Sequence, residues 1–353
     1  MNLKLNEILK WDNNNFGLVR LIAALAVLFG HSFDLFDDNG YTEPVRHLLK
    51  FDYSGSLAVY VFFFLSGIFI TASFVRSKTF VRFLLMRMFR IWSALIVCNI
   101  ITVFVIGPLF SLYPLSQYFG SPITWTYLFT NSTIWGEIAY NLPGVFNKNN
   151  YANTVNGSLW TLPMEVKCYC LVFFAGCAQL FKSSYYLAIL FVVFVALYLT
   201  NPVYFLKYIP EALAWKPVVF FIAGSIAYNL KNYIVIDYKI ALILVVSCLL
   251  LHHTGLFILV FYITLCYCVL IIGASALFKK INLPGDYSYG IYIYAFLTQQ
   301  MVASLYPEIT SYVSLLITVP VTCLLAILSW HFIEAPANKL ARNFAGKYEL
   351  WRS

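Results

Sequence analysis

Residues 53–75 read YSGSLAVYVFFFLSGIFITASFV, a run that contains no Asp, Glu, Lys or Arg. About 20 mostly apolar residues are enough for a helix to cross the hydrocarbon core of a bilayer. The run therefore predicts a membrane-spanning helix. It also indicates the class of the whole chain, because similar runs recur on both sides of it.

About ten such stretches are predicted along the 353 residues. They fall at roughly 17–36, 53–75, 84–107, 158–181, 184–200, 212–230, 239–251, 256–277, 287–305 and 310–333. The chain is thus predicted to be an all-α integral membrane protein with about ten transmembrane helices.

The overall composition agrees with this class. Only 11% of the residues are charged, against about 25% in a typical soluble domain, while 61% are hydrophobic and 19% aromatic. These values exclude a soluble globule, and they exclude a disordered chain, which would be poor in apolar residues. The net charge of +8 does not indicate a nucleic-acid partner, because the basic residues gather at helix ends rather than on one patch. The predicted partner is the lipid bilayer.

Loop charges predict the orientation, because Lys and Arg collect on the cytoplasmic side. Two of the 23 basic residues, Arg20 and Lys167, lie within predicted spans. Placing both termini in the cytoplasm leaves sixteen of the others inside. Only five fall outside: Arg46, Lys50, Lys148, Lys207 and Lys216.

One predicted loop, 108–157, is long and lies outside. Long loops without regular structure are usually functional or disordered, and Ile123–Phe129 is apolar enough to dip into the membrane interface. No repeat or second soluble domain is evident, so residues 1–353 are interpreted as a single membrane domain with helices at roughly 17–333.

The eight cysteines do not predict a metal site or a disulfide framework. All lie in apolar stretches, and the two Cys-x-Cys pairs, at 168/170 and 266/268, would point to nearly opposite sides of a helix. No metal is expected.

Charged side chains inside a membrane are costly and mark functional sites. Arg20 and His31 are eleven residues apart in the first predicted span, so they lie about 20° from one line and roughly 16 Å apart along the helix. This shared face favours a functional pair. The alternative is that Arg20 only anchors the helix end and His31 is a hydrogen-bonded core histidine.

Glu165 enters from the outer end of the fourth predicted span, at a depth similar to that of His31. A carboxylate beside an imidazole can hold its tautomer and stabilise the imidazolium, so Glu165 is predicted to orient His31. Two alternatives stay open. Glu165 pairs with Lys167, although residues two apart on a helix do not face each other, or His31 pairs with Asp34 one turn further along its own helix.

Arg87 and Arg90 share a helix face at the inner end of the third predicted span. Arginine binds phosphate by bidentate hydrogen bonds, so the pair can hold a phosphorylated ligand. The alternative is attraction to anionic lipid, which basic residues flanking any span provide.

Taken in order, these segments resemble the acyltransferase-3 family of membrane acyl transferases. The segments that carry the resemblance are Arg20-LIAALAVLFG-His31, Val61-FFFL-Ser66-Gly67, Arg87-MF-Arg90, Ser158-LWTLPM-Glu165, Tyr289-GIY-IY and His331-FIEAP, the last resembling a closing Glu-x-Pro turn. Each segment is weak alone, but their order along about residues 13–338 is specific.

The resemblance implies a membrane-bound O-acyltransferase. It would transfer an acyl group, most often acetyl, from cytoplasmic acetyl-CoA to a hydroxyl of a cell-envelope glycan or glycolipid in a bacterial inner membrane. Many members carry a His where this chain has Ala295, which concentrates the chemistry on His31. Some carry a fused SGNH hydrolase-like domain. This sequence ends at Ser353 without one, so it is expected to act directly or with a separate acyltransferase or polysaccharide-assembly partner.

In the mechanism that the resemblance implies, Arg87 and Arg90 bind the acyl-CoA phosphates and Arg20 guides the ligand. His31, oriented by Glu165, then deprotonates the acceptor or carries the acyl group itself. Trp160 is expected to line the outer mouth as a sugar platform, with an interfacial anchor as the alternative.

Two rival classes remain at this point. A proton-coupled secondary transporter would use His31 and Glu165 as a relay, and a scaffold would use its buried charges only to set helix packing. Binding of acyl-CoA discriminates, because only the transferase requires it.

Overall fold

The computed structural model describes residues 3–10, 14–37, 40–134, 136–183, 185–186, 189–190, 192–193, 196, 200, 215–276, 281 and 283–350. The chain forms two compact units, each assembled from three separate stretches. Unit 1 comprises Met1–Ile22, Val59–Arg76 and Cys168–Pro284, and unit 2 comprises Ala23–Ala58, Ser77–Lys167 and Gly285–Ser353.

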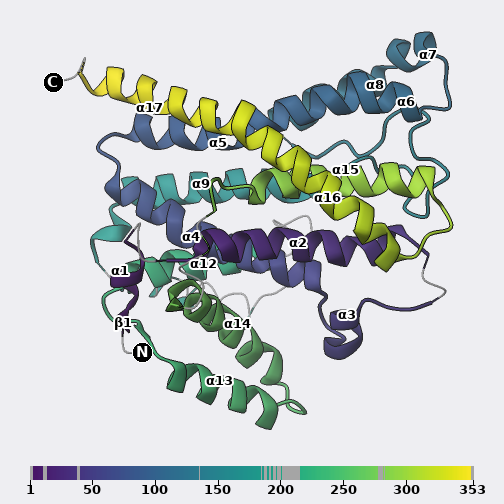
Figure 1. Cartoon of the computed structure of the whole chain (residues 1–353). Coiled ribbons are helices and arrows are strands. Elements are labelled where there is room, and N and C mark those ends of the chain that lie inside the picture. The colour runs from purple at the N-terminus through teal and green to yellow at the C-terminus, as the bar shows by residue number, and fades with distance from the viewer. Residues whose placement is uncertain are drawn as a thin grey trace. The chain divides into compact units, whose positions relative to one another are not determined.

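The regular secondary structure of the described residues is helical (Figure 1), apart from one two-stranded sheet and one isolated bridge. In chain order the elements are β1 (Leu3–Lys4), α1 (Leu5–Ile8), α2 (Phe16–Leu35), α3 (Pro44–Leu49), α4 (Ser54–Arg76), α5 (Phe80–Ile101), the π-helical η2 (Thr102–Ile106), α6 (Gly107–Phe110), α7 (Leu115–Gly120), α8 (Pro122–Thr133), the 3-10 helix η3 (Gly157–Thr161), α9 (Leu162–Cys177), the 3-10 helix η4 (Leu180–Lys182), α12 (Trp215–Asn229), β2 (Val235–Ile236), α13 (Tyr238–Leu250), α14 (Phe257–Ala274), α15 (Ser288–Leu305), α16 (Ser311–Ser329), the π-helical η6 (Trp330–Glu334) and α17 (Ala335–Leu350).

The all-helical prediction is confirmed for the described residues, and nine of the ten predicted spans coincide with helices there. Six helical stretches in that part of the chain are long and apolar enough to cross a membrane: Phe16–Leu35, Ser54–Arg76, Phe80–Phe110, Gly157–Cys177, Phe257–Ala274 and Ser311–Lys347. The predicted span at 184–200 and the loop lysines Lys207, Lys279 and Lys280 lie largely or wholly outside the described residues. A total of ten spans and cytoplasmic termini stay predictions.

Three other predicted spans form helices that are not among the six stretches long and apolar enough to cross a membrane. Helix α13 has 13 residues, so at about 1.5 Å per residue it falls short of a hydrocarbon core about 30 Å thick, and 15 residues of α12 are described. Helix α15 has 18 residues, but its sequence includes Thr298, Gln299 and Gln300. These three side chains are all buried in the protein.

In unit 1, helices α4 and α12 approach each other at two glycines. A β-carbon at Gly67 would overlap the Phe221 carbonyl, and one at Gly224 would overlap the Phe64 carbonyl. Small residues of this kind let membrane helices pack backbone against backbone. The Ser66-Gly67 motif therefore has a packing role. Elsewhere in the unit, α13 and α14 form a hairpin, and β1 pairs antiparallel with β2.

In unit 2, helices α15 and α16 form a second hairpin, and α17 runs beside α5 (Figure 1). The predicted turn at Glu334-Ala335-Pro336 is wrong. The chain stays helical from α16 through the π-helical η6 into α17, where Pro336 is the second residue.

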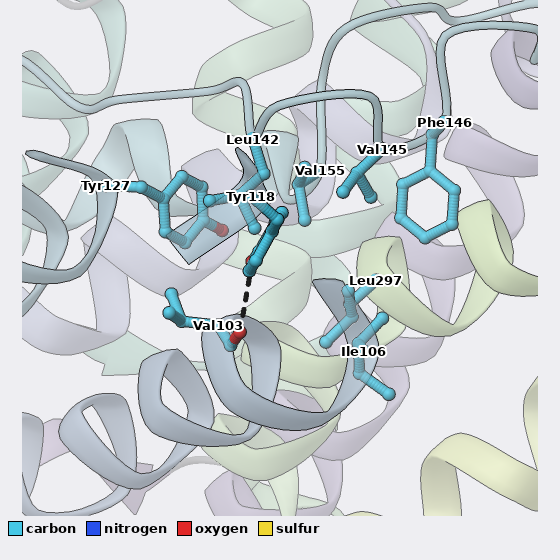
Figure 2. Close-up of a cluster of buried hydrophobic side chains, with 9 residues drawn as sticks. All are labelled: Val103, Ile106, Tyr118, Tyr127, Leu142, Val145, Phe146, Val155 and Leu297. Carbon is cyan, nitrogen blue, oxygen red and sulfur yellow. Dashed lines mark hydrogen bonds between the residues drawn. The ribbon is translucent and has the colours of Figure 1, made fainter. Parts of the chain in front are cut away.

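The segment 108–157 is folded around a core of its own rather than forming an irregular loop. Tyr118 on α7, Tyr127 on α8, and the later residues Leu142, Val145, Phe146 and Val155 pack against Val103, Ile106 and Leu297 (Figure 2). The Tyr118 hydroxyl donates a hydrogen bond of 3.0 Å to the Val103 carbonyl. This core fixes the residues just before α9 against α15. The predicted dip of 123–129 into the membrane interface stays a prediction.

Candidate functional site

Helix α2 carries both Arg20 and His31 on one uninterrupted helix, as the sequence predicted. Both side chains are partly buried. The C-terminal half of α2 lies against the start of α4, because Gly30 leaves room for Ser54 and Gly55 that a β-carbon would occupy. The position of His31 therefore depends on the close approach of the α2 and α4 backbones at Gly30, the residue before it.

The ring of Phe296 on α15 is the aromatic neighbour of His31. The two ring centroids are 5.3 Å apart at an interplanar angle of 81°, so one ring meets the other edge-on. One turn further along α15, Gln299 donates a hydrogen bond of 2.8 Å from Nε2 to the Leu28 carbonyl on α2. These two residues fasten α15 beside the helix that carries His31.

Two charged residues near His31 are Asp34, one turn further along α2, and Arg46. Arg46 pairs with Asp34 at 3.1 Å, and its guanidinium lies 4.8 Å from the centre of the Tyr53 ring. Arg46 is held there by α3, whose N-terminus is capped by Glu43 through a hydrogen bond of 2.6 Å from the Arg46 backbone N–H. Asp34 lies one turn from His31 on the same helix and is paired with Arg46, so pairing of His31 with Asp34, the alternative that the sequence left open, stays a prediction.

Glu165 lies in the first turn of α9. One turn before it, Thr161 Oγ1 is 2.6 Å from the Tyr292 hydroxyl on α15. His31 meets α15 at Phe296, about 6 Å along the helix axis from Tyr292. Thr161 and His31 thus contact the same helix about one turn apart, and direct pairing between Glu165 and His31 stays a prediction.

Lys167 and Trp160, which flank Glu165 in the sequence, differ in how far their side chains are exposed. Lys167 is exposed, and Trp160 in η3 is half-buried. The role of Trp160 as a sugar platform stays a prediction.

The structure gives Arg90 two carboxylate partners. Its guanidinium pairs with Asp286 at 2.7 Å and with Glu334 at 3.2 Å. The rings of Tyr289 and Trp330 lie within 5.9 Å of the same guanidinium. Because one guanidinium faces two carboxylates, the surroundings of Arg90 are those of a helix-linking ion pair. Its predicted contact with acyl-CoA stays a prediction, as does that of Arg87, which is partly buried one turn earlier.

Sequence reasoning missed Asp286 and Glu334. Glu334 belongs to the His331-FIEAP segment, but the predicted tenth span ended at 333, so the carboxylate was not counted among the groups in the membrane. It is 1% exposed and also accepts a hydrogen bond from Ser329. If the predicted tenth span had been extended by one turn, Glu334 would have been counted among the charged groups in the membrane.

Comparison with known proteins defines the family. A family profile described as an acyltransferase domain (acyltransferase-3) matches residues 13–333. The chain belongs to this family. A protein named O-acetyl transferase from Shigella phage Sf6 is 31% identical over 333 residues, covering 91% of this chain and 95% of the relative. Nodulation protein 10 from Rhizobium leguminosarum bv. viciae is 31% identical over 169 residues, which cover 46% of this chain and 44% of the relative. No solved structure matches the chain.

Family membership and the six apolar helical stretches together identify this acyltransferase as an integral membrane protein. The matched range contains Arg20, His31, Arg87, Arg90 and Glu165, so every charged residue that the sequence singled out for the site lies within the family domain.

Proposed function

We propose that this acyltransferase transfers an acetyl group from acetyl-CoA to a hydroxyl of a carbohydrate, with His31 at the reacting centre. The observation that carries the proposal is the similarity, over 91% of the chain, to a protein named O-acetyl transferase. The position of His31 supports it, because the imidazole is partly buried and has a carboxylate one turn away on the same helix.

In the proposed reaction the imidazole of His31 accepts the proton of the acceptor hydroxyl. The hydroxyl oxygen forms a bond to the thioester carbonyl carbon, the C–S bond breaks, and the proton passes to the departing thiolate of CoA. A nearby carboxylate stabilises the imidazolium that forms in between. Glu165 is the predicted carboxylate, and Asp34, one turn from His31 on α2, is the alternative. In a variant of this scheme, His31 first carries the acetyl group itself.

The donor phosphates are assigned to Arg87, and Arg20 is proposed to guide the ligand. Arg90 belongs to the predicted set, but its guanidinium is already paired with Asp286 and Glu334, so in this proposal it holds the inner end of α15 in place. The distance from Arg20 to His31 along α2, roughly 16 Å, is comparable to the length of an extended pantetheine arm.

The acceptor is proposed to be a glycan or glycolipid of the cell envelope, with Trp160 stacking on a sugar ring. The proposed location is a bacterial inner membrane, where a separate acyltransferase or a polysaccharide-assembly protein is the proposed protein partner. These assignments extend the family's membrane acyl transfer to a specific acceptor class.

The first test uses inverted membrane vesicles supplied with labelled acetyl-CoA and the host's envelope lipids. We expect wild type to place label in a base-labile ester, and His31→Ala to lose it at matched expression. His253→Ala is the matched control, because His253 is exposed in the turn before α14 and should leave labelling unchanged. Equal labelling by His31→Ala and wild type would refute the role of His31, and absence of acetyl-CoA binding would refute the transferase.

A further inference from the structure

The turn of α2 that carries His31 is bonded to side chains of the α15–α16 hairpin. Gln299 on α15 donates from Nε2 to the Leu28 carbonyl at 2.8 Å, three residues before His31. Ser311, the first residue of α16, donates from Oγ to the Ser32 carbonyl at 3.0 Å, one residue after His31. Two donors from one hairpin therefore bracket His31 along α2.

These bonds add to the ones that make α2 a helix. The Ser32 carbonyl also accepts the backbone N–H of Phe36 at 3.0 Å, and a carbonyl oxygen has two lone pairs with which it can accept both bonds. In the same way, the partner of the Leu28 carbonyl within a regular helix is the N–H four residues on. What Gln299 and Ser311 add is a fixed height and rotation of this turn relative to the hairpin.

The apolar contacts in the same place are not directional in this way. The Phe296 ring, which meets His31, packs in a buried cluster with Leu35 at the end of α2. The Tyr312 ring meets that of Phe33 edge-on at 5.3 Å. Apolar burial is roughly proportional to area and has no preferred direction, whereas a hydrogen bond requires a specific distance and angle. Polar bonds between membrane helices are therefore well suited to fix the register of one helix against another.

The surroundings of Gln299 indicate a requirement for position rather than for stability. Its side chain is 0% exposed, and its Oε1 has no hydrogen-bond partner among the described residues. A buried polar atom left unpaired costs at least as much as one hydrogen bond contributes, so an apolar side chain would serve stability equally well. An apolar side chain would lack the directed bond to Leu28.

We infer that Gln299 and Ser311 are positioning residues for His31, which fix the turn of α2 so that the imidazole and the Phe296 ring meet edge-on. The inference rests on the proposed function and deepens it, because the position of the imidazole limits turnover only if the imidazole reacts. A general base must lie within hydrogen-bond reach of the proton that it accepts, and a small displacement slows the step. Loss of either donor should therefore lower kcat and leave KM for acetyl-CoA unchanged.

The test compares Gln299→Met and Ser311→Ala with controls that lose the same kind of group from the same helices. Gln300→Met is the control on α15, because Gln300 is equally buried and its Nε2 donates to the Tyr151 carbonyl at 2.7 Å instead. Ser314→Ala is the control on α16, because Ser314 is equally buried and its Oγ donates at 2.7 Å to the Ser311 carbonyl within that helix.

Two quantities are measured. The chain contains five histidines, so protein labelled with carbon-13 at the imidazole Cε1 gives few NMR signals, and the signal of His31 is the one missing from His31→Ala. The second quantity is turnover, as kcat and KM for labelled acetyl-CoA in inverted membrane vesicles. Ser311→Ala deletes a single oxygen atom, so it carries the test if Gln299→Met does not fold.

We expect Gln299→Met and Ser311→Ala to shift or broaden the His31 signal and to lower kcat about three- to tenfold, the effect of one lost hydrogen bond. Gln300→Met and Ser314→Ala should leave the His31 signal in place. An unchanged His31 signal or an unchanged kcat in both test variants would overturn the inference, and so would an equal change of the signal in the controls. Absence of acetyl transfer by wild type would instead refute the proposed function, and the His31 signal would then by itself show whether the two residues fix the ring.

Discussion

Replacing Arg90 by methionine tests the ion-pair network that links three parts of unit 2. Arg90 lies on α5, Asp286 just before α15, and Glu334 at the end of η6. The side chain of Arg90 is 15% exposed and that of Glu334 only 1%. Arg90→Met therefore removes the guanidinium that pairs with this buried carboxylate, for which we expect a loss of about 3–5 kcal/mol in the free energy of unfolding.

The matched comparison is Arg46→Met. The Arg46–Asp34 pair has a similar distance, 3.1 Å, but its side chains are 42% and 30% exposed, so solvent screens it and we expect a loss of about 0–1 kcal/mol. Both variants are unfolded in mixed micelles by dodecyl sulfate while tryptophan fluorescence is recorded. The double variant Arg90→Met/Glu334→Leu should be more stable than Arg90→Met, because it also removes the buried carboxylate that pairs with Arg90. A loss no larger than that of Arg46→Met would refute the reasoning.

Three further changes have defined outcomes. Gly67→Ala should lower the free energy of unfolding by about 1–3 kcal/mol, because α4 must move away from α12, and an unchanged unfolding curve would contradict the close approach. Asp34→Asn should lower kcat for acetyl transfer about tenfold with little change in KM for acetyl-CoA, whereas an unchanged kcat would leave Glu165 as the orienting carboxylate. Burial raises the pKa of Tyr127, so its contribution to stability is present below pH about 10 and is lost as the pH rises further. Unfolding measured between about pH 8 and 11 should show this loss in wild type and not in Tyr127→Phe.

Much of the helical layout could be predicted from local hydropathy. The runs that became α2, α4 and α14 were expected within two or three residues of their observed ends. The reason is that a long apolar run has one low-energy solution in a bilayer, a helix that satisfies its own backbone hydrogen bonds. Arg20 and His31 followed from the same argument, because positions on one helix are set by its period.

Hydropathy predicted the structure less well in segments where apolar and polar residues alternate irregularly. The segment 108–157 was expected as a long loop, yet Tyr118, Tyr127 and Val155 build a core with α5, η2 and α15. The end of the tenth span was misjudged because a π-helical turn carries the helix past Glu334 and into α17. Neither feature has a periodic signal that sequence reasoning can use.

The sequence by itself determined the membrane class, most of the helices and the family, because each depends on residue types and their order along the chain. Only the tertiary structure decided which side chains meet. Arg90 lies 196 residues from Asp286 and 244 from Glu334, and His31 meets Phe296 on a helix near the other end of the chain. Such pairs depend on which faces of distant helices pack together, and that is settled by the shapes of all the side chains between them.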